Sequence, residues 1–137
     1  MKRSIIYLFV ILIALSPIFN VFAQGNQEAT VKTIKPKVFA LDFVFSYNML
    51  NSIELRASEV DALLEVKNAL KPYIEQIQKE NIPLTNAVTF EISTAIAHNM
   101  LQFMERGKLV GSDAEKYKRF VEGIAEAAKA LKPEEKK

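Results

Sequence analysis

The sequence predicts an all-α protein: a compact antiparallel bundle of about four helices after a cleaved signal peptide. Three observations support this fold class. Apolar side chains recur at helical spacing through three long segments between residues 58 and 131, the pattern of amphipathic helices that pack together. The connections between these segments are short, which favours antiparallel neighbours. The chain contains no cysteine, so apolar packing rather than disulfide bonding must stabilise the domain.

Residues 1–23 have the features of a secretory signal peptide. Two basic residues precede an apolar run over residues 5–15, and Val21 and Ala23 are the small residues expected at positions −3 and −1. We therefore expect cleavage before Gln24. The apolar run is shorter than the roughly 20 residues that a transmembrane helix needs. The mature protein is accordingly expected to be periplasmic or secreted, with no stable membrane anchor after signal cleavage.

Two polar segments flank the expected helical domain, residues 37–132. Residues 24–36 show no sustained periodicity and are expected to form a flexible leader. Pro133 ends the last helical pattern, and residues 133–137 are expected to form a charged tail.

The net charge argues against nucleic acid as a partner. The full chain carries 18 basic and 16 acidic residues, and the predicted signal peptide contains two of the basic ones. The mature chain would therefore carry equal numbers of the two signs. No net attraction to nucleic acid or to an anionic membrane follows.

The first predicted helix, residues 37–54, admits two interpretations. On a helical wheel the segment has almost no polar side. In a strand, alternate positions would form one apolar face, namely Phe39, Leu41, Phe43, Phe45 and Tyr47. We favour a helix, because a lone strand has no partner in an otherwise helical chain. Pro36 also suits the first turn of a helix.

The second predicted helix, residues 58–80, has a clear amphipathic pattern. Ser58 and Asp61 resemble a capping box at its start. Pro72 lies inside the pattern, but the apolar stripe keeps its phase across it, so we expect a kink or a restart rather than a break. The apolar positions are Val60, Leu63, Leu64, Val66, Leu70, Tyr73, Ile74 and Ile77.

The third predicted helix, residues 85–106, is apolar over a wider arc than a surface helix needs. Thr85 is the expected N-cap and Gly107 the expected residue after the C-cap. We therefore expect this helix to be central in the fold. Its two apolar stripes consist of Val88, Ile92, Ile96, Met100 and Phe103, and of Phe90, Ala97, Leu101 and Met104.

The fourth predicted helix, residues 112–131, begins at a capping box formed by Ser112 and Glu115. One face is apolar and the other is charged, which is typical of a helix at the surface of a bundle. The apolar face consists of Tyr117, Phe120, Val121, Ile124, Ala128 and Leu131.

The sequence offers no recognisable catalytic or metal site. His98 is the only histidine, and Glu91 and Glu105 are each seven residues away, about 10.5 Å along a helix, too far to share one ion. Met100 and Met104 lie on the apolar stripe, where methionine usually fills the core. Phosphate-binding loops, nucleophile elbows and di-iron motifs are absent from the sequence. We expect a non-enzymatic protein without metal or cofactor.

The remaining feature is a surplus of apolar side chains in the first and third predicted helices. Phe39, Phe43, Phe45 and Tyr47 are the candidate contact residues, because aromatic side chains commonly anchor interfaces. They would contact a protein partner or a second copy of the chain through an apolar surface. The sequence thus favours an interaction or structural module. The alternative is a carrier that holds a lipid or a non-covalent haem in the bundle core.

Overall fold

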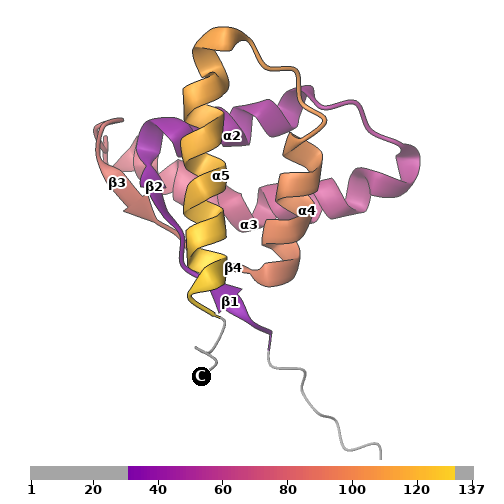
Figure 1. The fold of residues 1–137 in the computed structure, drawn as a ribbon, viewed down its shortest axis with the longest axis horizontal. Coiled ribbons are helices and arrows are strands. Elements are labelled where there is room, and N and C mark those ends of the chain that lie inside the picture. Colours follow the sequence, from indigo (N-terminus) through magenta and orange to yellow (C-terminus); the bar gives the residue numbers. More distant parts are fainter. Residues whose placement is uncertain (1–30, 132–137) are drawn as a thin grey trace, which may run out of the picture. The chain divides into compact units, whose positions relative to one another are not determined.

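The computed structural model describes residues 31–131, so the predicted signal peptide and charged tail lie outside the described residues. The described part is mostly helical, as predicted, but it also contains short strands. In Figure 1, α4 and α5 run up the view and α2 and α3 run across it. The helices are α2 (Ala40–Met49), α3 (Val60–Lys79), α4 (Thr94–Met104) and α5 (Ala114–Lys129), and the strands are β1 (Thr33–Ile34), β2 (Lys37–Phe39), β3 (Ala87–Thr89) and β4 (Ile92–Ser93).

The strands form two small antiparallel sheets that the sequence analysis did not predict. β1 pairs with β4, and β2 pairs with β3. The register is the same in both sheets: Thr33 lies opposite Ser93, and Phe39 lies opposite Ala87. The two sheets therefore follow one another along the same two chain segments and make one antiparallel ribbon.

The ribbon has an inner and an outer face, because successive strand side chains point to opposite sides. The inner side chains are buried in the core, and they include Ile34, Val38, Phe90 and Ile92. The outer side chains of the first segment are exposed, and they are Thr33, Lys35, Lys37 and Phe39. The outer face is thus mostly polar, with one large aromatic residue at its end.

The predicted helix over residues 37–54 is instead a strand followed by a helix. Lys37–Phe39 form β2, α2 begins at Ala40, and a 3-10 turn follows at Leu50–Ser52. We favoured the helix over the strand because a lone strand would have no partner. That partner exists at residues 87–89, in a segment that was assigned to the third helix.

The third predicted helix starts later than expected. Residues 87–89 and 92–93 are strands, and α4 covers only Thr94–Met104. The N-cap is Ser93 rather than Thr85: the Ser93 hydroxyl accepts a hydrogen bond from the backbone N–H of Ile96 at 3.1 Å. The apolar residues before Ser93 serve the ribbon and not the helix.

The expected leader, residues 24–36, ends earlier than predicted. Residues 31–36 belong to the described structure, where Thr33–Ile34 form β1. Ile34 and Pro36 are buried. Two apolar side chains at alternate positions were too short a pattern to separate a strand from a polar leader.

The second and fourth predicted helices agree closely with α3 and α5. α3 is one continuous helix that includes Pro72. The exposed position of this proline leaves the buried stripe of the helix undisturbed. α5 is preceded by a 3-10 turn at Gly111–Asp113, and no side chain caps its first turn. The capping box predicted from Ser112 is therefore wrong.

The start of α3 is also capped differently from the prediction. Ser58 and Asp61 were the expected pair, but no side chain caps α3 itself. A 3-10 turn at Ala57–Glu59 precedes α3, and there the carboxylate of Glu59 accepts a hydrogen bond from the backbone N–H of Arg56 at 2.9 Å. This hydrogen bond lowers the pKa of Glu59 below its ordinary value, and hydrogen bonding from Arg106 lowers it further.

Three phenylalanines occupy the centre of the core. Phe43 of α2 meets Phe90 of the ribbon edge to face, with ring centroids 4.7 Å apart. Phe90 stacks on Phe120 of α5, with centroids 6.2 Å apart and ring planes within 7°. All three side chains are fully buried.

Candidate functional site

The structure separates the four candidate contact residues. Phe39 is 46% exposed, whereas Phe43 is only 1% exposed and belongs to the core. Phe45 and Tyr47 are half-buried against the core, and the Phe45 ring lies beneath the amine of Lys116 at 5.5 Å. Of the four, Phe39 is the most exposed.

Phe39 belongs to a small apolar patch with Leu41 and Leu84, which we call the Phe39 patch. All three side chains are exposed. The backbone N–H of Leu41 donates to the carbonyl oxygen of Leu84 at 2.9 Å, which fixes the two segments side by side. With Thr85 and Arg119 the patch lines an open hollow of about 220 Å³. Sequence reasoning missed Leu84, which follows a proline in a connection.

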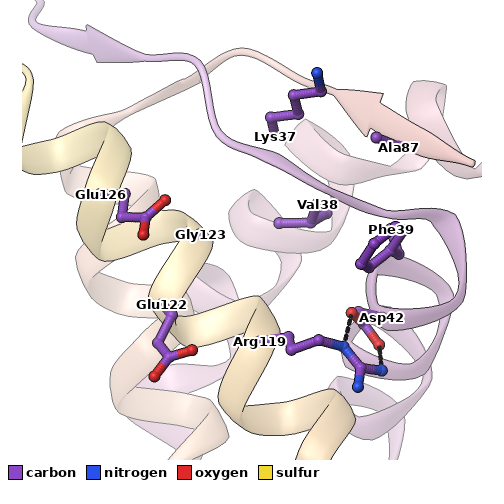
Figure 2. A pocket seen from close by; sticks show the side chains of 9 residues that line it. All are labelled: Lys37, Val38, Phe39, Asp42, Ala87, Arg119, Glu122, Gly123 and Glu126. Carbon is purple, nitrogen blue, oxygen red and sulfur yellow. Dashed lines mark hydrogen bonds and ion pairs between the residues drawn. The ribbon is translucent and has the colours of Figure 1, made fainter.

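Arg119 is held beside this patch by a buried carboxylate. Asp42 of α2 is fully buried, and its two oxygens accept hydrogen bonds from Nε and Nη2 of Arg119 at 2.9 and 2.7 Å. The pair is a bidentate fork, drawn with dashed lines in Figure 2. The hydrogen bonding from Asp42 raises the pKa of Arg119. The guanidinium carbon also lies 6.0 Å from the centre of the Phe39 ring.

The sequence did contain a signal for this pair. Asp42 is the only charged residue between residues 38 and 53, and a charge in so apolar a segment must find a partner when it is buried. The identity of the partner was not visible, because Arg119 lies 77 positions away along the chain.

A second hollow, the β2–α5 groove, adjoins the Phe39 patch and shares Phe39 and Arg119 with it. Its volume is about 300 Å³. Val38 on the strand faces Gly123 on α5, and Lys37 lies on the strand side and the two glutamates on the helix side (Figure 2). The lining residues are Lys37, Val38, Phe39, Asp42, Ala87, Arg119, Glu122, Gly123 and Glu126.

The charged side chains of the groove are only partly paired within the chain. Within residues 31–131, Lys37 and Glu126 form no ion pair, and Glu122 reaches Lys118 at 3.8 Å. The Lys118–Glu122 pair is solvent-exposed, and such pairs contribute little to stability. Within the described residues the strand wall thus carries one unpaired basic residue, Lys37, and the helix wall one unpaired acidic residue, Glu126.

Two further polar residues, His98 and Glu91, lie outside the Phe39 patch and the β2–α5 groove. His98 is exposed on α4, and the described residues contain no group of three or more metal-ligating side chains that could hold an ion. Glu91, on the outer face of the ribbon, accepts a hydrogen bond from the hydroxyl of Thr33 and pairs with Lys35 at 3.1 Å. Both contacts lower the pKa of Glu91, the Thr33 hydrogen bond most.

Comparisons with known proteins identify no relative of this chain. The chain matches no family model, and neither the curated proteins nor the solved structures give a significant match. Between residues 31 and 131, no helix combines the length and the apolar character that crossing a membrane requires.

Proposed function

We propose that this chain is an exported, non-enzymatic interaction module that binds a protein partner through the Phe39 patch. The observation that carries the proposal is the exposure of Phe39, Leu41 and Leu84 together beside Arg119. Aromatic and arginine side chains are the residues that most often anchor protein interfaces. A contiguous apolar patch with a polar rim is typical of such a surface.

The shape of the patch favours a protein over a small molecule. Its hollow measures about 220 Å³, below the usual range of small-molecule sites, roughly 300 to 1,000 Å³. It is an open depression, which accepts one apolar side chain of a partner more readily than it encloses a ligand. The fork with Asp42 holds Arg119 in place before binding, so little side-chain entropy is lost when a partner contacts it.

Export is the second part of the proposal, and its support is the pattern of the first 23 residues. A protein that acts in the periplasm or outside the cell should begin at Gln24 when it is isolated from its native host. N-terminal sequencing of that protein tests the point. A mature chain that begins at Met1 in a cytosolic fraction would contradict it.

A cross-linking experiment tests the binding surface. The chain has no cysteine, so a Leu84→Cys variant carries a single thiol that can be labelled with benzophenone maleimide. The labelled protein is mixed with the envelope and secreted fractions of the native host and irradiated. The matched control is Asn68→Cys, at an exposed position of α3.

We expect one adduct of defined mass from position 84, none at that mass from position 68, and loss of the adduct when Phe39→Ser is added. Circular dichroism of each variant verifies that it is folded. The same adducts from both positions, or an adduct that is insensitive to Phe39→Ser, would show that the patch is not the binding surface.

A further inference from the structure

We propose that the partner is a second copy of this chain, docked on the face formed by the outer side of β2 and the adjoining side of α5. The inference rests on the proposed function, because the Phe39 patch lies at the end of this face. It adds the identity of the partner and the geometry of the contact. What carries it is the arrangement of charges along the β2–α5 groove.

β2 and α5 run in opposite chain directions along the groove. Phe39 lies beside Arg119, whereas Gly123, further along α5, lies against Val38 and the carbonyl of Lys37. The strand and the helix therefore form two walls that can be followed together from the Phe39 end of the groove.

The two walls carry opposite charges beyond the Phe39 end. On the strand wall the charged residue is Lys37, and on the groove side of α5 Glu122 and Glu126 follow Arg119, whose charge is paired with Asp42. From Phe39 to Lys37 the strand advances about 6.6 Å, whereas from Arg119 the helix advances about 4.5 Å to Glu122 and about 10.5 Å to Glu126. Lys37 therefore lies at a level between the two glutamates.

The strand wall of one copy is complementary in charge to the helix wall of a second copy. A two-fold axis that runs along the groove, in the plane of the contact, places the strand wall of each copy over the helix wall of the other. Arg119 then faces the partner's Phe39, and Lys37 lies between the partner's Glu122 and the partner's Glu126, of which Glu122 is also paired with Lys118. This is an isologous interface, in which each pairwise contact occurs twice. A partner of uniform charge would be attracted by one wall and repelled by the other.

The charges required for this contact are available. Lys37 and Glu126 form no ion pair within residues 31–131, and Figure 2 shows the Lys37 amine directed away from α5. The predicted mature chain has equal numbers of basic and acidic residues, so two copies experience no net repulsion. The exposed apolar residues of the Phe39 patch would supply the desolvated apolar part of the interface.

Charge reversal and charge exchange test the geometry. Sedimentation velocity of the chain from Gln24 onward, over a range of concentrations, measures the dimer dissociation constant. Lys37→Glu and Glu126→Lys each place like charges opposite one another twice per dimer, and each should raise this constant at least about tenfold. Lys108→Glu makes the same charge change at a side chain that is 95% exposed outside the proposed face, and it should leave the constant unchanged.

The decisive sample is an equimolar mixture of the Lys37→Glu and Glu126→Lys variants. In the mixed dimer both halves regain opposite charges, so the dimer should return, and it should also return in the double variant. A wild-type chain that stays monomeric up to about 1 mM overturns the inference. If neither charge reversal raises the dimer dissociation constant, or if the mixture of the two variants does not dimerise, the inference is overturned as well. A position-84 adduct with a different protein would leave the proposed function standing while this inference fails.

Discussion

We expect Gly123→Ala to destabilise the protein, although alanine is the better helix former. Gly123 lies inside α5, where β2 passes against the helix. A Cβ atom at this position would lie 2.6 Å from Cγ1 of Val38 and 3.3 Å from the carbonyl oxygen of Lys37. Neither neighbour moves easily, because Val38 is a buried β-branched residue with a stiff χ1 angle, and the carbonyl belongs to the backbone.

Two opposing terms set the magnitude. Replacing glycine by alanine in a helix interior gains about 1 kcal/mol. Overpacking a filled site costs about 1 to 3 kcal/mol, and a contact of 2.6 Å to a constrained methyl group places Gly123→Ala in the upper part of that range. The net loss should be about 1 kcal/mol, or a fall in Tm of about 4 to 8 °C for a domain of this size. Urea unfolding followed by circular dichroism measures it as a change in midpoint at constant m.

Two control variants test whether the loss comes from the close approach of Val38 to Gly123 or from the introduction of alanine in general. Gly111→Ala meets no atom within 4 Å, so it should be neutral or should stabilise by up to about 1 kcal/mol. Val38→Ala removes the clashing methyl group, so the double variant should lose at least about 0.5 kcal/mol less than the sum of the single losses. If Gly123→Ala is as stable as the wild type, or if the double variant is additive, α5 does not pack on β2 as described.

Three further predictions concern buried and charged groups. Ser46→Ala should raise the free energy of unfolding by about 1 kcal/mol, because the Ser46 hydroxyl is buried without a hydrogen-bond partner; a loss of stability in urea unfolding would contradict this. Arg119→Met leaves the buried Asp42 carboxylate unpaired, so it should lower Tm more than the double variant Arg119→Met/Asp42→Leu does; an equal or larger loss in the double variant would refute the role of the pair. The pKa values of Glu59 and Glu91 are lowered in the folded protein. Their ionised forms therefore stabilise the fold above the ordinary pKa of 4.5, and this contribution is lost as the pH falls through the lowered values. Glu59→Gln and Glu91→Gln should each flatten the fall in stability between about pH 5 and pH 3, and acid titrations with unchanged slopes would contradict this.

The parts of the fold that the sequence predicted are those whose determinants are local. α3 and α5 follow from apolar residues at helical spacing. The ribbon does not, because its two segments are separated by more than 40 residues and each is only a few residues long. Phe90 and Ile92 fit the apolar stripe of a helix as well as the inner face of a strand. These residues form strands because they pair with residues 33–39. A single sequence carries no information on pairing between such distant segments.

Of the candidate site, the sequence predicted Phe39 but not Leu84, Arg119 or Gly123. Phe39 was a candidate because it is one of several aromatic residues in an apolar segment. The period-2 pattern in the sequence placed Phe39 on one apolar face with Phe43, whereas in the structure the strand ends at Phe39, which is exposed, and Phe43 is buried in α2. The groove itself depends on Gly123 and Arg119, which lie in a helix more than 75 positions away along the chain. A lone glycine within a helical pattern was the available sign of a close approach.

The ribbon is stabilised by contacts with residues that are distant in sequence, which is also why it could not be predicted from local patterns. A two-stranded ribbon is marginal in water, and its edges need cover. α5 packs along the β2 edge, where the carbonyl of Lys37 faces Gly123. On the other edge, the hydroxyl of Tyr73 accepts a hydrogen bond from the N–H of Glu91 at 3.0 Å and donates one to its carbonyl oxygen at 3.2 Å. Because α5 covers one edge and also forms one wall of the groove, a variant that loosens α5 should weaken the fold and the proposed interface together. Charge reversals at exposed Lys37 and Glu126 avoid this coupling, since neither side chain packs in the core.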